Sequence, residues 1–188
     1  MPELEPARRT YAFEVPKQQE KLQDLIAYIA IKCESDPLFG MTKLAKILFF
    51  SDFLHYAKYG KPITGVTYHK YPQGPLPKDM YETIRSSQNL EEVARKRFNY
   101  DQKRVVARQE PDLSLFTATE IATVDMVIDE LALLDARGVS ELSHSIAWEV
   151  VADQEPMPYE SAFFSHECPS RQDVAQAEEL LRAGLLDP

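Results

Sequence analysis

KLAKILFFSDFLHYAKYGKPITGVTYHKYPQGPLP, residues 43–77, carries the strongest structural signals of the chain. Its first part is apolar around most of a helical circumference. This predicts a helix over about 42–58 in the middle of the fold, with Thr42 as its N-cap. A turn containing Gly and Pro then leads into a β-rich strand over about 66–71. The segment has no pattern of a nucleophile, a phosphate loop or a metal site, so it predicts a scaffold that presents a surface for binding.

Hydrophobic periodicity and turn residues predict the other elements. Thr117-x-x-Glu120 is a capping box that starts a helix, and Gly138 is its expected stop. Pro77 fits the first position of a helix, where its missing N–H costs nothing. The elements expected are helices over about 17–34, 77–88, 117–136, 140–152 and 170–184, and strands over about 91–98 and 103–108. Together they predict an α+β fold: a mostly helical single domain with a small, about three-stranded antiparallel sheet.

Length and composition fit one domain with extensions. With 188 residues, of which 44% are hydrophobic, the chain can bury a core without disulfides or metals. We expect an irregular leader at 1–16, the domain at 17–152, and a C-terminal extension at 153–188, whose proline-rich loop and final helix pack on the domain.

The sequence also indicates the cellular compartment in which we expect the protein. No apolar run approaches the ~18–20 residues of a membrane span, and the N-terminus has no apolar signal core. The two cysteines, Cys33 and Cys168, form no CxxC pattern. These features predict a cytoplasmic protein with reduced thiols and no membrane contact.

Charge is distributed unevenly along the chain. Residues 85–108 carry seven basic and three acidic side chains, whereas residues 109–188 carry three basic and 17 acidic side chains, net −14. An acidic half repels nucleic acid and attracts a basic partner through complementary potential. The alternative is a well-solvated surface without a charged partner.

Residues with catalytic chemistry are few and scattered. Asp52 and His55 share a face of the predicted helix over 42–58, and with His69 and His144 they could form a metal or acid–base site. Two ligands on one helix do not complete a metal site, and the sequence has no HExxH pattern and no GxSxG elbow. We therefore interpret Asp52 and His55 as a polar stripe, and we predict no catalytic residue, no metal and no cofactor.

A basic pair of strands is the main argument for nucleic-acid binding. Its basic side chains would release counterions from a phosphate backbone, and Phe98 and Tyr100 could stack on bases. Outside residues 85–108, however, the chain sums to −13, and no DNA- or RNA-binding motif is readable. We therefore interpret these charges as partners of the acidic half. They are Arg95, Lys96, Arg97, Lys103, Arg104 and Arg108.

The middle of the chain is rich in tyrosine, which interfaces favour because it combines a large rigid body with a polar tip. We predict a protein-binding surface formed by the turn around residue 59 and by the strand and corner that follow. Half-buried tyrosines around a small sheet are the alternative. The predicted partner-binding residues are Tyr59, Tyr68, Tyr71, Gly74 and Pro75.

Three motifs together resemble the Panacea domain, the SocA-like antitoxin family. The family's Lys-Leu-Leu-Tyr-Phe-Ala-Asp helix is similar to Lys46-Ile47-Leu48-Phe49-Phe50-Ser51-Asp52. Its turn motifs follow in the same order as Tyr59-Gly60-Lys61-Pro62-Ile63-Thr64-Gly65, Tyr68, Gly74-Pro75-Leu76-Pro77 and Tyr81. Its Leu-Ser…His…Trp region is similar to Leu142-Ser143-His144 and Ala147-Trp148. The resemblance covers about residues 20–150 and departs from about Asp153.

The resemblance implies a mostly helical α+β domain that neutralises a toxin by direct binding, encoded beside varied small toxins and in prophages. One branch of the family acts as an adaptor that delivers its toxin to a cytosolic protease, and no enzyme activity is attached to the family. The expected function is therefore an antitoxin-like protein. A protease adaptor is the alternative within the binding class, and a metal- or histidine-dependent enzyme is the alternative from another class.

Overall fold

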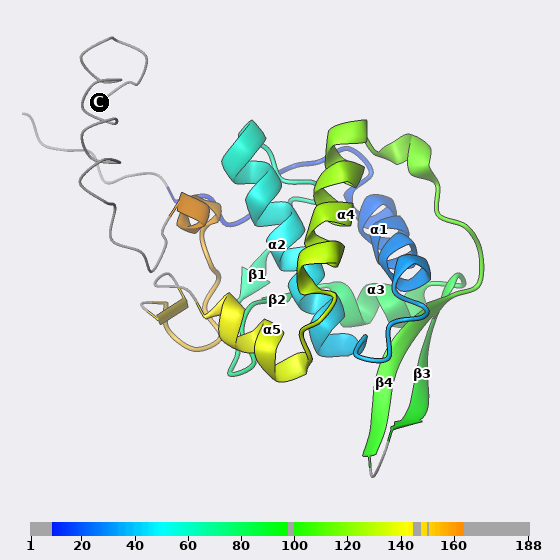
Figure 1. The fold of residues 1–188 in the computed structure, drawn as a ribbon. Helices are drawn as coiled ribbons and strands as arrows, with labels where there is room; N and C mark the ends of the chain where they lie inside the picture. Colours follow the sequence, from blue (N-terminus) through cyan, green and yellow to red (C-terminus); the bar gives the residue numbers. More distant parts are fainter. Residues whose placement is uncertain (1–8, 98–99, 145–147, 150, 164–188) are drawn as a thin grey trace, which may run out of the picture.

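The computed structural model describes residues 9–97, 100–144, 148–149 and 151–163 (Figure 1). Within these residues the fold is α+β, with five α-helices and two small antiparallel sheets, which confirms the predicted fold class. The helices are α1 (Gln18–Lys32), α2 (Met41–Tyr59), α3 (Met80–Ser86), α4 (Ala118–Leu131) and α5 (Ala136–Ser143), and the strands are β1 (Tyr68–His69), β2 (Leu76–Pro77), β3 (Leu90–Arg97) and β4 (Tyr100–Ala107).

Helix α2 lies in the middle of the molecule, with α1, α4 and α5 around it (Figure 1). Its apolar residues face all sides, and Leu44, Ile47 and Leu48 are fully buried in the core. Burial of each large apolar side chain stabilises the fold by roughly 1.5–3 kcal/mol, so α2 is its main hydrophobic anchor. The helix is capped by Gly40 in an extended conformation, and the predicted N-cap, Thr42, lies inside the first turn.

The predicted three-stranded sheet is replaced by two separate two-stranded sheets. In the first sheet Tyr68 of β1 lies opposite Pro77 of β2, and in the second Leu90 of β3 lies opposite Ala107 of β4. The prediction that Pro77 starts a helix is therefore wrong. Pro77 lies in a strand of two residues, where a missing N–H is tolerated at an edge, and α3 begins only at Met80.

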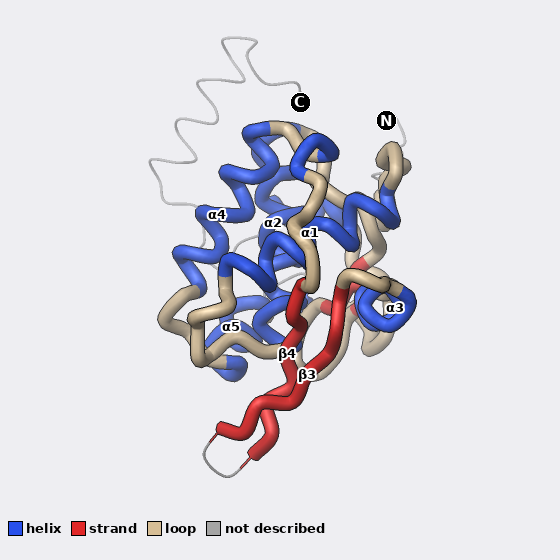
Figure 2. The backbone as a smooth tube through the Cα atoms, turned by 90° about the vertical axis from the view of Figure 1, so that its right-hand side faces the viewer, coloured by secondary structure: helices blue, strands red, loops and turns tan. Residues whose placement is uncertain are grey.

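The β3–β4 hairpin projects from the helical body, as Figure 2 shows. Its base is held by Leu90 and Val105, which are buried, whereas Ala94, Arg95 and Lys96 further along β3 are exposed. The base of the hairpin therefore belongs to the core, and the outer part faces solvent.

Helix α4 begins at the predicted capping box, in which the Thr117 hydroxyl accepts from the Glu120 N–H and the Glu120 carboxylate accepts from the Thr117 N–H. The helix ends at Leu131, earlier than predicted, and Gly138 does not stop it. Gly138 lies inside α5, where its N–H donates to the side chain of the N-cap Asp135 at 2.9 Å. Capping by Asp135 starts a new helix at this point.

The described part of the C-terminal extension, residues 153–163, packs against the core. Met157 and Tyr159 are fully buried, and the Tyr159 hydroxyl donates to the Val66 carbonyl at 2.7 Å. The Tyr159 N–H donates to the Thr10 carbonyl, so the segment before α1 and the segment after α5 are joined. The helix predicted over 170–184 lies outside the described residues.

Candidate protein-binding site

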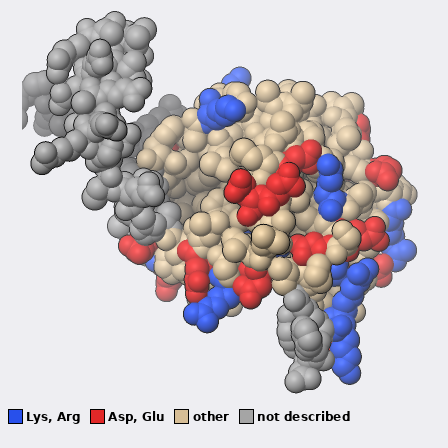
Figure 3. Space-filling view, in the orientation of Figure 1, with Lys and Arg blue, Asp and Glu red and all other residues tan. Residues whose placement is uncertain are grey.

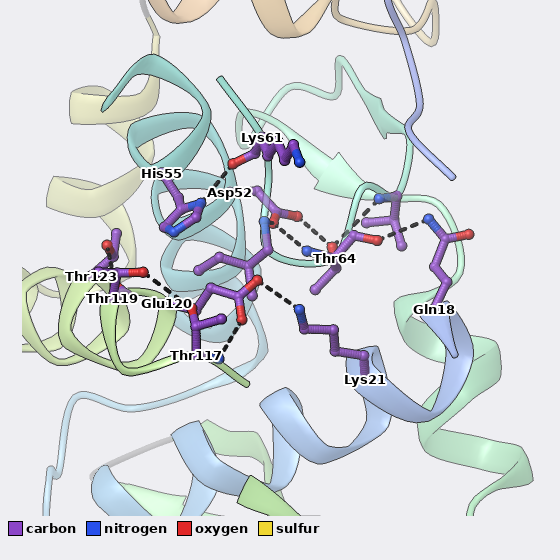
Figure 4. Close-up of polar contacts among 12 residues, drawn as sticks. Gln18, Lys21, Asp52, His55, Lys61, Thr64, Thr117, Thr119, Glu120 and Thr123 are labelled. Carbon is purple, nitrogen blue, oxygen red and sulfur yellow. Dashed lines mark hydrogen bonds and ion pairs between the residues drawn. The ribbon is translucent and has the colours of Figure 1, made fainter. Parts of the chain in front are cut away.

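Asp52 of α2 holds the turn that follows this helix. Its side chain is fully buried, and the carboxylate accepts hydrogen bonds from the Ile63 N–H at 2.8 Å and the Thr64 N–H at 2.7 Å. The Thr64 hydroxyl also donates to it, and so does the Tyr68 hydroxyl at 2.8 Å. Figure 4 shows Asp52 and Thr64 turned toward each other. Four donors around one carboxylate fix the turn against the helix.

Burial dominates the electrostatics of this cluster. Desolvation raises the pKa of Asp52 above its ordinary value, although hydrogen bonds to the charged form oppose this shift. Desolvation and the nearby Asp52 also hold the pKa of Tyr68 and of Tyr159 well above the ordinary tyrosine value. Both tyrosine hydroxyls therefore stay protonated and act as donors, and the carboxylate has a structural role.

Lys46 of α2 reaches a second turn. Its ammonium donates to the Pro75 carbonyl at 2.6 Å, and the residue is only 2% exposed. Gly74 has a φ of +91°, and a Cβ at this position would lie 2.1 Å from the Ser143 hydroxyl oxygen and 2.8 Å from Lys46 Cε. Both the conformation and the close approach require glycine. Burial lowers the pKa of Lys46 to about 7, so keeping this side chain charged in the folded protein costs free energy.

Trp148 contacts the chain at Tyr71, close to the turn that Lys46 reaches. We call this region, residues 71–75, the corner. Its indole N–H donates to the Tyr71 carbonyl at 3.2 Å, and its ring stacks on His144 with the centroids 3.8 Å apart. The Lys70 ammonium lies 4.4 Å from the centroid of the indole ring, a cation–π contact. Tyr71 and Gly74 help to line a small cavity of about 100 Å³ at this corner.

A larger groove of about 390 Å³ lies between the second half of α2 and α4. Three of its lining residues are large and partly exposed: Leu54 at 43%, Tyr59 at 43% and Met126 at 49%. Apolar side chains that gather at a concave surface are typical of protein contact sites. We call this surface the α2–α4 groove, and it is lined by Leu54, Ala57, Lys58, Tyr59, Thr119, Ala122, Thr123 and Met126.

The structure separates the five predicted partner-binding residues. Tyr59 lines the α2–α4 groove, whereas Tyr71 and Gly74 line the small cavity at the corner. Tyr68 is fully buried, and its hydroxyl belongs to the buried carboxylate cluster. Gly74 and Pro75 are also buried, so they shape the corner, and Tyr59 and Tyr71 are the members of this set that reach the surface.

The four residues of the enzyme alternative have different surroundings. The Asp52 carboxylate accepts its hydrogen bonds from the turn after α2, and His55 Nδ1 lies 2.6 Å from the Lys61 carbonyl oxygen. His69 lies in β1, and His144 stacks on the indole ring of Trp148. In the part of the chain that the structure describes, no group of three or more His, Cys, Asp or Glu side chains is placed to hold a metal. The remaining histidine of the sequence, His166, lies outside that part.

The basic hairpin is partly built into the fold. Arg104 is 3% exposed and donates to two backbone carbonyls at the end of α1, both at 3.0 Å. Lys103 and Arg108 form ion pairs with glutamates of β3. Arg95 and Lys96 are exposed, and Figure 3 shows basic side chains along the projecting hairpin.

Sequence reasoning missed three features of this region. The burial of Lys46 had a signal, because a lysine on a helix that is apolar all round has no polar face to occupy. The α2–α4 groove had none, because it forms only when two helices about 60 residues apart in the sequence pack together. A buried ion pair between Lys21 and Glu120 at 2.6 Å, which ties α1 to the start of α4 (Figure 4), was also not predicted.

The described residues form a mostly helical α+β domain in which buried polar side chains of α2 hold two turns. The sequence of residues 44–149 matches the family described as Antitoxin SocA-like, Panacea domain, over more than half of the chain, and the chain belongs to this family. The matched range contains Lys46, Asp52 and both turns that they hold. A family of antitoxins points to a role other than catalysis.

Comparison with curated proteins and with solved structures finds no match. None of the helices among the described residues is both long and apolar enough to cross a membrane.

Proposed function

We propose that this protein is a cytoplasmic antitoxin that neutralises a cognate toxin by direct protein–protein contact. The family match over residues 44–149 carries the proposal. The use of Asp52 and Lys46 to hold turns supports it, because these buried charges stiffen a surface. A rigid surface suits recognition, since little conformational entropy is lost when a partner binds.

Charge supports a basic toxin. Residues 109–188 carry a net charge of −14, and Asp129 and Glu130 of α4 are exposed close to the α2–α4 groove. Acidic side chains cross the face that carries α4 in Figure 3. Charges at the rim of an interface mainly accelerate encounter. Association should therefore slow as salt is added, and a rate that does not respond to salt would contradict the electrostatic part of the proposal.

We assign the contact surface to Tyr59 and Tyr71, with Tyr68, Gly74 and Pro75 holding the backbone behind them. Tyr71 is partly exposed and its carbonyl is fixed by an indole N–H. Tyr71→Asp should therefore weaken the complex while the fold is kept. An unchanged affinity in a folded variant would remove Tyr71 from the interface.

Co-expression tests the function itself. The small open reading frame beside this gene is expressed from an inducible promoter, alone and together with the chain. Growth arrest that the chain relieves, together with a complex of the two proteins at near-equal amounts, is the expected result. Continued arrest in the presence of folded chain would contradict an antitoxin function.

The fate of the toxin separates masking from delivery. After synthesis is stopped, a masked toxin stays bound and intact. A toxin that disappears only when both the chain and a cytosolic protease are present would favour the adaptor alternative.

A further inference from the structure

A histidine with a buried ring nitrogen packs on Tyr59, one of the residues that line the α2–α4 groove. His55 is 6% exposed, and its Nδ1 lies 2.6 Å from the Lys61 carbonyl oxygen. A carbonyl oxygen only accepts, so Nδ1 carries the proton, and in the neutral ring Nε2 is then an acceptor. Nε2 is buried and has no hydrogen-bond partner among the described residues.

The orientation of the ring connects this nitrogen with the groove. Figure 4 shows the nitrogen of His55 that does not contact Lys61 turned toward the part of α4 that carries Thr119 and Thr123, and both threonines line the groove. Tyr59 packs on the His55 ring with the centroids 4.6 Å apart and is 43% exposed. Binding of a groove ligand at Nε2 requires this tyrosine, which also lines the groove, to rotate.

The polar groups near the α2–α4 groove favour a ligand that donates a hydrogen bond. The Thr123 hydroxyl already donates to the Thr119 carbonyl at 2.8 Å, and the Thr119 hydroxyl lies 3.1 Å from the Thr117 hydroxyl. The Thr123 hydroxyl proton is therefore engaged, whereas the lone pair of His55 Nε2 is available. A buried acceptor left without a donor is destabilising, so a partner that brings a donor into the groove regains this energy.

We propose that the α2–α4 groove binds a tryptophan side chain of the toxin, with the indole N–H donating to His55 Nε2. Tryptophan has the one strong hydrogen-bonding group that is neutral and only donates. Its large apolar body suits a groove edged by Leu54, Tyr59 and Met126. The other side chains that only donate, lysine and arginine, are disfavoured by the charge of Lys58 in the groove lining.

This inference rests on the proposed function, because it assigns the tryptophan to a toxin. It also predicts the neighbourhood of that tryptophan. Asp129 and Glu130 follow Met126 by about one turn of α4 and are exposed. A basic side chain close to the tryptophan would meet these carboxylates, in agreement with the charge expected for the toxin.

A small probe tests the groove without the toxin. N-acetyltryptophanamide is titrated into the full-length protein labelled with ¹⁵N, and the shifts of the backbone amides and of the His55 ring nitrogens are recorded. A dissociation constant of about 1 mM is expected for an isolated side chain, with shifts at the groove and at Nε2. The benzothiophene analogue, which has sulfur in place of the N–H and nearly the same shape, should bind about tenfold more weakly.

Two surface variants make the test specific. Met126→Glu places a charge in the groove lining and should abolish binding of the probe. Leu133→Glu, in the connection between α4 and α5, is the matched control, because Leu133 is 92% exposed and does not line the groove. It should leave the affinity unchanged.

Equal affinity of the two analogues would overturn the role of Nε2, and an absence of shifts at the groove at about 10 mM probe would overturn the site. If the toxin is neutralised while the probe fails, the proposed function stands and this inference falls. If the probe binds while no toxin is neutralised, the assignment of the groove to a toxin falls.

Discussion

Lys46→Met should stabilise the protein at neutral pH. Lys46 is 2% exposed, and the Pro75 carbonyl is the hydrogen-bond acceptor of its ammonium. Methionine has a similar length and flexibility, so it fills the same space without a charge that must be removed from water. Replacing a buried charged group by an apolar one of similar volume is often neutral or stabilising.

The magnitude follows from the pKa. Burial lowers the pKa of Lys46 from 10.5 to about 7, and each unit corresponds to about 1.4 kcal/mol. Because the folded pKa lies below the unfolded one, the unfolded chain binds more protons between these two values, and the free energy of unfolding rises with pH in that window. Linkage gives a rise of about 2 kcal/mol for the unsubstituted protein from about pH 7 to pH 9.

The variant lacks this pH dependence and one hydrogen bond. At about pH 7 the desolvation cost that Lys46→Met removes is roughly 4 kcal/mol. The lost hydrogen bond from a charged donor is worth about 1.5–3 kcal/mol. A net stabilisation of about 1–2 kcal/mol is therefore expected.

Urea unfolding followed by circular dichroism between about pH 6 and pH 9 measures both quantities. The series stops there because burial raises the pKa of Cys33 from 9.0 to about 11. Above its unfolded pKa this thiol binds more protons in the folded state, so it lowers stability as pH rises and would oppose the Lys46 effect.

A second buried lysine of α2 is the matched control. Lys43 is 1% exposed, but its ammonium pairs with Asp36 at 2.7 Å and donates to the Ala132 carbonyl at 2.9 Å. Lys43→Met leaves that aspartate without its partner and should destabilise by about 2–4 kcal/mol. The reasoning is refuted if Lys46→Met destabilises as much as Lys43→Met, or if its difference from the unsubstituted protein does not change with pH.

Three further predictions test the turns and the hairpin. Gly74→Ala should destabilise by about 2–4 kcal/mol in urea, because its φ is +91° and a new Cβ would lie 2.1 Å from a serine hydroxyl of α5. Gly60→Ala, with φ +70° and nothing within 4 Å, should cost only about 1 kcal/mol, and equal costs would contradict the role of close approach. Asp52→Asn should cost about 1–3 kcal/mol and Asp52→Ala more than about 4 kcal/mol in the same assay, whereas similar losses would mean that the hydrogen bonds contribute little. Arg104→Met should raise hydrogen exchange of the β4 amides about tenfold or more, and Arg108→Met, which breaks an exposed ion pair, should leave exchange nearly unchanged; equal exchange in both variants would contradict anchoring of the hairpin by the buried guanidinium.

Elements with local signals were predictable from the sequence. The capping box at Thr117 and Glu120 starts α4 because both partners lie within one turn. Signals that fit two structures misled: Pro77 suits a helix start and also an edge strand, and only its pairing with Tyr68 selects the strand. Gly138 likewise lies in α5 because Asp135 caps a new helix before it.

The candidate site was less predictable than the elements. The motifs that identify the family were readable along the chain, and with them the general role. Exposure was not readable, because Tyr59 and Tyr68 have the same chemistry, and only packing leaves the first 43% exposed and the second fully buried.

By itself the sequence determined the fold class, the order of helices, the family and the uneven charge, since each depends on residue types and spacing. The tertiary structure alone decided where the polar groups of α2 find partners. A helix that is buried on every side forces Asp52 and Lys46 to bond with turns more than ten residues away, at Thr64 and Pro75. The α2–α4 groove depends in the same way on packing between distant segments, because a concave surface needs two elements brought together and neither element contains it alone.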